Sequence, residues 1–338
     1  MDAPQVRYAR AEDDVEIAYA VAGSGPPLLV VDSLLWQADM RFDARLAPLV
    51  EVATVIAYDP RNTGLSGDST RVGLDDYLSD IDAVLSALGI EVVALRGRVA
   101  PSQIALAYAA TRARRVARLI LVHPLPPGAS PRTAPSIQEF GGVASTSWDL
   151  FAELLALKLL AWRDIERARI LYENLRSRWN GEKWHRVMAS FESLDASELL
   201  GAIRAPTLII SSRDPAASNS YDPDADEYCR HLAAAIRHAQ LALVDDSDDT
   251  NFGSPSLAIE FLQAAEGDMP GDDGGVLTRR EHEILELIAS GHDNGAMAQR
   301  LTLSARTVER HVHNIYTKLG VHNRVEAANW AREHGMRP

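Results

Sequence analysis

One stretch near the end of the chain carries side chains suited to reading DNA. Between Ala305 and Leu319, apolar residues recur at helical spacing, which predicts a helix with one buried face. The residues of that face are Val308, Val312, Ile315 and Leu319. The opposite face holds side chains able to contact phosphates or base edges, namely Arg306, Glu309, Arg310, His313, Asn314 and Thr317. Taken alone, this face is equally compatible with an ordinary solvated helix surface.

Three more short helices are predicted around this one, because start and stop signals recur through the last part of the chain. Thr278-x-x-Glu281 has the form of a capping box, in which each side chain bonds the other residue's backbone N–H. A second short helix is expected at about 295–301. The remaining signals are the caps Ser304 and Asn323-x-x-Glu326, and the terminating glycines Gly291, Gly320 and Gly335. Four short helices with a tight joint between the second and third indicate a helix–turn–helix.

The same segments resemble the LuxR/FixJ-type DNA-binding domain. They read LTRREHEILELIASG (277–291), MAQRLTLSARTVERHVHNIYTKLGV (297–321) and HNRVEAANWAREHG (322–335). The resemblance implies that the third helix enters the major groove. It assigns base reading to Glu309, Arg310 and His313, and backbone contacts to Thr307 and Lys318, with Arg310 suited to a bidentate guanine contact. One departure is Gly295-Ala296 after Asn294, where that family often has Lys-Glu.

A linker and a change of charge separate this module from the rest of the chain. The segment 266–275, EGDMPGDDGG, has no apolar periodicity and is rich in glycine, proline and aspartate. From residue 276 onward there are 9 Lys+Arg and 7 Asp+Glu, against 25 and 40 before it. Such an asymmetry indicates separate partners. We therefore expect a large domain at 1–265, a linker at 266–275 and a DNA-binding domain at 276–338.

Composition excludes several protein classes. With 46% hydrophobic and 24% charged residues among 338, the chain is typical of a globular protein and not of a disordered one. No apolar run is long enough to cross a bilayer, and 1–11 lacks the apolar core of a signal peptide. The single cysteine, Cys229, excludes an internal disulfide and a cysteine-rich zinc site. A cytoplasmic protein without a metal or cofactor is expected.

The first 265 residues alternate short apolar runs with amphipathic helices. The runs are Leu28–Val31, Ala53–Tyr58, Val92–Leu95, Leu119–Val122, Thr207–Ile210 and Leu241–Val244, and the clearest helices are Leu74–Leu88 and Ser102–Ala110. This alternation predicts an α/β fold with a doubly wound, mostly parallel sheet, and the opening segment Val6–Ala22 predicts an edge hairpin. About 126–200 is helical and aromatic, which predicts a cap over the carboxyl edge of the sheet, where ligands bind in such folds. Its aromatic residues are expected to form the core of the cap, with the lining of a pocket as the alternative.

This part of the chain resembles the α/β-hydrolase fold, in the segments PPLLVVDS (26–33), IAYDPRNTGLSG (56–67), 92–125 and APTLIISSRD (205–214). That fold presents its nucleophile in a G-x-S-x-G turn after a strand. Here the turn reads Gly97-Arg98-Val99-Ala100-Pro101. The resemblance therefore places Val99, which has no nucleophilic group, at the nucleophile position, and a proline at the second glycine.

The other catalytic positions are also altered. Asp214 matches the acid of the triad, but Asp249 stands where the histidine is expected, and Asp32-Ser33 replaces the usual His-Gly. Because a nucleophile and its base act as a unit, losing both removes the Ser-His mechanism. Ser102, interpreted as a helix cap, and His123, interpreted as a packed residue, are poor replacements.

These observations favour a ligand-responsive transcriptional regulator that binds double-stranded DNA as a homodimer. Its inactive hydrolase-like domain would hold a small apolar effector, with an ester or a lactone as one option. The expected ligand-binding residues are Asp32, Ser33, Trp36, Val99, Ala100, Asp249 and Asn251. Two alternatives are an active hydrolase that is also a regulator, and a constitutive DNA-binding protein whose large domain only dimerises.

Overall fold

The computed structural model divides into two compact units, residues 1–262 and 263–338, which are treated separately below. It describes residues 4–32, 35, 46–130, 132–133, 135–160, 165–212, 225–244, 254–264, 277, 279–301, 308–309, 311–312, 315–316, 319, 321 and 323–333. Within these ranges, no helix combines the length and the apolar character that a membrane crossing requires.

An eight-stranded sheet lies at the centre of the first unit, in the order β1-β2-β4-β3-β5-β6-β7-β8. Its strands are β1 (Arg7–Arg10), β2 (Glu16–Ala22), β3 (Pro27–Val31), β4 (Thr54–Tyr58), β5 (Val93–Arg98), β6 (Val116–Val122), β7 (Thr207–Ser212) and β8 (Ala239–Val244). The pairs β1–β2 and β2–β4 are antiparallel and the remaining pairs are parallel. Each apolar run expected to be a strand lies within or overlaps one of these, and 6–22 forms the predicted edge hairpin. The α/β prediction is thus confirmed.

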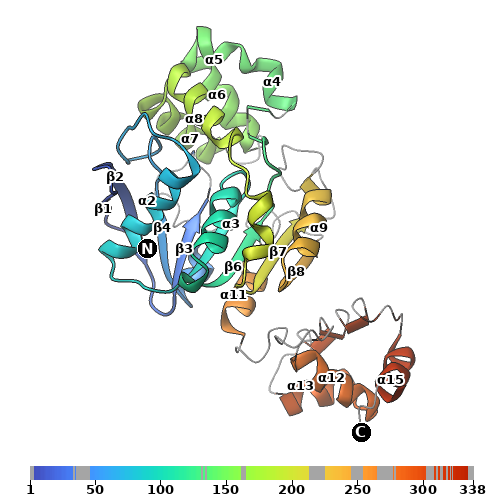
Figure 1. The fold of residues 1–338 in the computed structure, drawn as a ribbon. Coiled ribbons are helices and arrows are strands. Elements are labelled where there is room, and N and C mark those ends of the chain that lie inside the picture. The colour runs from blue at the N-terminus through green and yellow to red at the C-terminus, as the bar shows by residue number, and fades with distance from the viewer. Residues whose placement is uncertain are drawn as a thin grey trace. The chain divides into compact units, whose positions relative to one another are not determined.

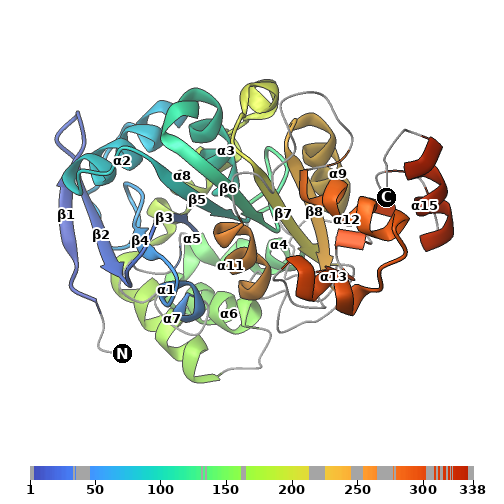
Figure 2. The ribbon, with the colours of Figure 1, turned by 90° about the horizontal axis from the view of Figure 1, so that it is seen from below.

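Helices cover both faces of the sheet, which explains why its central strands are largely apolar. Helices α2 (Leu74–Ala87), α3 (Ser102–Thr111) and α9 (Ala225–Ala235) lie on one face. On the other lie α1 (Ala47–Val50) and α11 (Pro255–Gln263), and a short 3-10 turn (Ala113–Arg115) precedes β6 (Figure 2). Leu95 faces α3, whereas its neighbour Arg96 faces the opposite side, because side chains alternate along a strand.

A group of helices forms the predicted cap after β6 (Figure 1). Its elements are α4 (Pro135–Gly141), α5 (Val143–Thr146), α6 (Trp148–Leu159), α7 (Ile165–Arg178), α8 (Gly181–Glu192) and a 3-10 helix (Ser197–Ala202). Phe151, Trp179 and Trp184 are buried and their rings contact one another or neighbouring rings. These three aromatic residues therefore lie in the core of the cap, as expected, whereas Trp162 lies outside the described residues.

The second unit has its own apolar core, built from α12 (Arg279–Ala289), α13 (Asn294–Leu301), α15 (Arg324–Glu333) and the described residues of 308–319. Those described residues are helical, and Val308, Val312 and Ile315 are buried, which confirms the buried face predicted for the third helix. Gly291 ends α12 with a positive φ of 81° in a Schellman arrangement, where His292 N–H donates to Leu287 O. The start of α15 is capped by the predicted Asn323–Glu326 pair.

Asp293 caps the second helix of this unit, a role that was not predicted from the sequence. Its Oδ1 accepts the Ala296 N–H at 2.7 Å. Helix α13 thus begins at Asn294, close to the start predicted at about 295. The unusual Gly295-Ala296 pair therefore does not loosen this helix end, and Met297 immediately after it is fully buried.

Candidate functional site

The turn between β5 and α3 keeps the geometry that would present a nucleophile. Val99 has a φ of +50°, which is a strained conformation for a β-branched residue. Its carbonyl accepts the Ser102 N–H at 3.0 Å, so the chain passes directly from strand to helix. Gly97 allows the close approach, because a Cβ there would lie 2.7 Å from the Cβ of Ala105. This turn, called the elbow below, therefore has the backbone conformation that presents a side chain at its tip, and that side chain is a valine.

Val99 has apolar neighbours. Val99 packs against a small cluster made of Ala100, Leu125, Ala129 and Ala225, which are all buried. An isopropyl group has no proton to give up and no lone pair with which to attack a carbonyl carbon. At the tip of this elbow, the side chain can only make van der Waals contacts.

A buried ion-pair cluster lies beside the elbow, at the ends of β3 and β5. Arg96 Nη1 lies 3.1 Å from Asp32 Oδ2, and Arg98 Nη1 lies 3.6 Å from Asp32 Oδ1. The side chains of all three residues are mostly buried, with Arg98 the most exposed at 14%. Asp32 therefore serves as the partner of two arginines, at the position where the resemblance to the α/β-hydrolase fold implies a His-Gly turn.

The two arginines were missed by the sequence analysis, although a signal was present. The segment VALRGR places Arg96 and Arg98 two residues apart at the end of a buried parallel strand. That spacing puts both guanidinium groups on one face of the sheet. Charged residues in such a run require a buried partner, and Asp32, at the end of the adjacent strand, was the available one.

The two residues weighed as replacement catalysts are both buried. Ser102 was predicted to cap α3, and this is wrong: Pro101 is the N-cap residue, and Ser102 lies one position inside the helix with its hydroxyl bonded to none of the described residues. His123 follows β6 with a φ of +45°, and its N–H donates to Ile210 O at 2.9 Å. Its 1% exposure agrees with a packed histidine.

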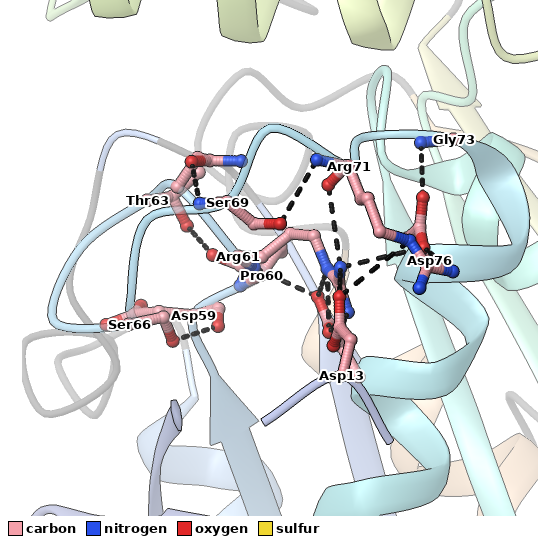
Figure 3. Close-up of polar contacts among 12 residues, drawn as sticks. Asp13, Asp59, Pro60, Arg61, Thr63, Ser66, Ser69, Arg71, Gly73 and Asp76 are labelled. Carbon is pink, nitrogen blue, oxygen red and sulfur yellow. Dashed lines mark hydrogen bonds and ion pairs between the residues drawn. The ribbon is translucent and has the colours of Figure 1, made fainter. Parts of the chain in front are cut away.

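A second polar cluster organises the loop that follows β4 (Figure 3). The guanidinium of Arg61, which is fully buried, lies 2.7 Å from Asp80 Oδ1 and 2.8 Å from Asp13 Oδ2. Asp76 is 3.6 Å away and also pairs with the exposed Arg71 at 2.8 Å. Burial raises the pKa of Asp80 to about 6, although its bonds from Arg61 act to lower it. This cluster joins the edge hairpin, the loop and α2.

The loop is held internally as well. Gly64 has a positive φ of 47°, and a Cβ on it would lie 2.2 Å from Asp59 Oδ2. The same carboxylate accepts the Leu65 N–H at 2.9 Å, and Ser66 Oγ donates to Asp59 O. This loop therefore forms a fixed platform at the carboxyl edge of the sheet.

Polar contacts seat the cap on this edge. Asn174 of α7 donates to Leu35 O at 2.7 Å, and the Lys183 ammonium of α8 lies 2.9 Å from Asp68 in the loop after β4. The Tyr77 and Ser190 hydroxyl groups lie 2.6 Å apart and join α2 to α8. In Figure 1 the cap helices accordingly lie at the end of the sheet where β3, β4 and β5 finish.

In the second unit, only one of the residues predicted to contact DNA, Glu309, is among the described residues. Glu309 is exposed, whereas Val308 and Val312 of the same helix are buried. Arg324, which was not predicted, donates to Asn294 Oδ1 at 3.2 Å and to His292 O, so it ties α15 to the joint before α13. Its position directly after the Asn323 cap was the only sequence signal.

The remaining predicted site residues lie outside the described residues. In the first unit these are Ser33, Trp36, Asp214, Asp249 and Asn251, and in the second Arg306, Thr307, Arg310, His313, Asn314, Thr317 and Lys318. Of the residues predicted to bind a ligand, the structure thus brings together Asp32, Val99 and Ala100 at the ends of β3 and β5.

Comparison with known proteins identifies both units. Residues 275–331 match the family model "Bacterial regulatory proteins, luxR family", and residues 26–184 match the alpha/beta hydrolase fold. The Fimbriae Z protein of Salmonella typhimurium is 34% identical over 82 residues, which are 24% of this chain and 39% of that protein. The CsgBAC operon transcriptional regulatory protein of Escherichia coli is 37% identical over 62 residues, 18% of this chain and 29% of that protein. The chain thus spans well under half the length of these relatives.

Solved structures match the first unit in fold. A meta-cleavage product hydrolase from Pseudomonas fluorescens IP01 superposes with a TM-score of 0.62 at 20% identity, covering 76% of this chain and 97% of the other. The enol-lactonase of Burkholderia xenovorans LB400 gives a TM-score of 0.60 at 20% identity, over 76% and 100%. The chain therefore joins an α/β-hydrolase-fold domain to a C-terminal helix–turn–helix domain of the luxR family of bacterial regulatory proteins.

Proposed function

We propose that this protein is a DNA-binding transcriptional regulator, working in the cytoplasm, whose hydrolase-fold domain binds a small molecule without hydrolysing it. The observation that carries the proposal is Val99 at the tip of an intact elbow, in a chain whose C-terminal domain belongs to a family of regulatory proteins. A strained turn that holds a side chain unable to react fits a fold kept for binding.

The proposed effector site lies between the sheet and the cap. Its proposed lining is Asp32, Ser33, Trp36, Val99, Ala100, Asp249 and Asn251. The apolar cluster around Val99 favours an apolar ligand, with an ester or a lactone as one option. The effector would act by binding one DNA-binding arrangement of the protein more tightly than another, since equal affinity for both would shift nothing.

We expect no turnover of esters or lactones above background by the purified full-length protein. The Val99→Ser variant is expected to remain inactive, because a serine without a base is a weak nucleophile. The measurement is release of product from a panel of chromogenic esters and lactones. Steady turnover by the unaltered protein that is abolished in Ser102→Ala would overturn this and would favour the alternative of an active hydrolase that is also a regulator.

We expect a homodimer on DNA, because one helix–turn–helix makes few contacts and paired half-sites usually supply the rest. On α15, Val325 is 69% exposed and Asn329 one turn later is also exposed, whereas Ala328 packs into the core. This face and the large domain are the two proposed interfaces. Selection from a random duplex library should enrich paired half-sites about one helical turn apart. Footprinting of a single half-site occupied by a monomer would contradict it.

A constitutive regulator, whose large domain only dimerises, is separated by a different measurement. A ligand that binds the native state raises the melting temperature. A small apolar molecule that raises the melting temperature of the protein and also changes its affinity for the selected DNA supports the sensor. A shift in melting without any change in DNA affinity would argue against regulation by that ligand.

A further inference from the structure

One face of the cap helix α6 carries leucines at the spacing of a coiled coil. Leu150, Leu154 and Leu157 follow one another after four and three residues, like the d, a and d positions of a heptad. Leu150 is 47% exposed, and Leu154 and Leu157 are partly exposed. The helix packs into the cap through its other side, where the buried residues are Phe151, Ala152, Leu155 and Ala156. The core of the cap therefore does not account for the leucine stripe.

Neighbouring helices of the cap contact α6 on either side of this stripe. Toward α7, Asp149 lies 3.0 Å from Arg176 Nε and accepts the Tyr172 hydroxyl at 3.1 Å. Toward α4, the ring of Phe151 lies 5.7 Å from that of Phe140. Since each residue turns a helix by about 100°, the three leucines lie on the arc between these contacts, away from the buried side. The two neighbours thus hold α6 in place and leave its leucine face to solvent.

Two opposite charges border the leucine stripe. Glu153 directly precedes Leu154, and Lys158 directly follows Leu157, so they stand at the g and e positions of the same heptad. Both side chains are exposed, and neither belongs to an ion pair among the described residues. In a parallel pair of helices, a g position lies beside the e position five residues later on the other helix. Glu153 of one copy would therefore meet Lys158 of a second copy.

These charges distinguish between the two possible directions of pairing. In an antiparallel pair, g positions face g positions and e positions face e positions, so Glu153 would face Glu153 and Lys158 would face Lys158. In a parallel pair related by a twofold axis, each leucine packs against its counterpart and the Glu153–Lys158 pair forms twice. The face is therefore complementary to itself in the parallel direction, which fits a second copy of this chain as its occupant.

We propose that the large domain pairs with a second copy of this chain through α6, in a parallel contact along Leu150, Leu154 and Leu157 with Glu153–Lys158 ion pairs at both edges. The inference rests on the proposed homodimer and places its interface in the cap. Such a contact is small beside the roughly 1,200 Å² of a stable complex, so the dimer is weak in free solution. On paired half-sites, the two DNA-binding domains and this contact strengthen each other, because the second contact becomes intramolecular.

The test is sedimentation equilibrium of the full-length protein without DNA, over a series of concentrations. We expect a reversible equilibrium between monomer and dimer. The Leu154→Glu variant should stay monomeric over the same series, because two carboxylates would meet at the centre of the contact, and its melting temperature checks that it is folded. An unaltered protein that stays monomeric throughout overturns the proposal. So does a Leu154→Glu variant that dimerises as tightly as the unaltered protein.

Charge exchange tests the direction of the pairing with exposed positions alone. Glu153→Lys and Lys158→Glu each place like charges together twice, and each should weaken the dimer by roughly tenfold. The double variant should restore the affinity of the unaltered protein. Glu173→Lys is the matched control, since it makes the same change at an exposed residue of α7 and should leave the dimer unchanged. Single variants that dimerise like this control, or a double variant that is not restored, overturn the parallel contact.

Binding to the selected DNA separates this inference from the proposed function. If the unaltered protein occupies paired half-sites while the α6 variants dimerise normally, the regulator stands and its interface lies elsewhere, for example on α15. If the protein dimerises through α6 but prefers no DNA sequence, the regulator is wrong and the contact stands.

Discussion

Replacing Arg61 with methionine is expected to lower the free energy of unfolding of the large domain by about 3–5 kcal/mol. The Arg61 side chain is fully buried, and its guanidinium is the shared partner of Asp80, Asp13 and Asp76. Methionine fills a similar volume, but it leaves the completely buried Asp80 carboxylate without its cation. An uncompensated buried charge lowers the free energy of unfolding far more than the loss of an exposed ion pair does.

The free energy of unfolding lost in Arg61→Met should grow as the pH rises. In the native protein, burial raises the pKa of Asp80 to about 6 even though Arg61 bonds to it. A carboxyl whose pKa is raised by folding reduces stability as the pH climbs from its unfolded value of 3.8 through its folded value. Without Arg61 the pKa of Asp80 rises further, so the penalty becomes larger and extends to higher pH. Asp13 adds to the same trend, because its hydrogen bond from Arg61 lowers its pKa and stabilises its ionised form.

Arg71→Met is the matched control. Arg71 bonds Asp76 in the same cluster, but its side chain is 66% exposed, and an exposed pair contributes about 1 kcal/mol or less. Urea unfolding of both variants and of the unaltered protein, at pH 5 and pH 8, measures the difference. A cost for Arg61→Met no larger than that for Arg71→Met, or one that does not change with pH, would show that the cluster does not hold the domain together.

Two features of the fold could be predicted from the sequence. The strands were predictable, because uninterrupted apolar runs between helices arise from strands that are covered on both faces. The turn at Gly97 was predictable too, since a strand followed at once by a helix needs a residue without a side chain there. Both features depend on neighbours that are close in the sequence.

Long-range partners were not predictable from local pattern. Arg61 meets Asp13 and Asp80 across 48 and 19 residues, and Arg96 meets Asp32 across 64. Only the sheet order brings these charges together. Ser102 was misjudged because a serine beside a predicted helix start is usually a cap, whereas here Pro101 takes that position and the elbow begins the helix one residue earlier.

The second prediction of a large effect concerns the face of the third helix that we propose to bind DNA. Arg310→Ala is expected to weaken binding to the selected DNA by about 1–3 kcal/mol and to relax the preference at one base position, because a bidentate guanine contact would be lost. Lys318→Ala is the contrasting variant. A phosphate contact carries no sequence information, so its loss should weaken all sequences alike and reduce the slope of affinity against salt by roughly one unit.

The same titrations test whether the C-terminal domain carries the DNA sequence preference of the protein. The unit from 263 onward has its own buried core, and the 276–338 segment carries a small excess of basic residues, whereas the remainder is acidic and a poor source of phosphate contacts. The isolated 276–338 fragment should therefore keep the sequence preference while losing affinity, since a dimer doubles the phosphate contacts. Full-length protein and fragment are each measured against selected and scrambled duplexes across a salt series. A fragment without preference, together with a large domain that shows one, would contradict the assignment of DNA reading to the C-terminal domain.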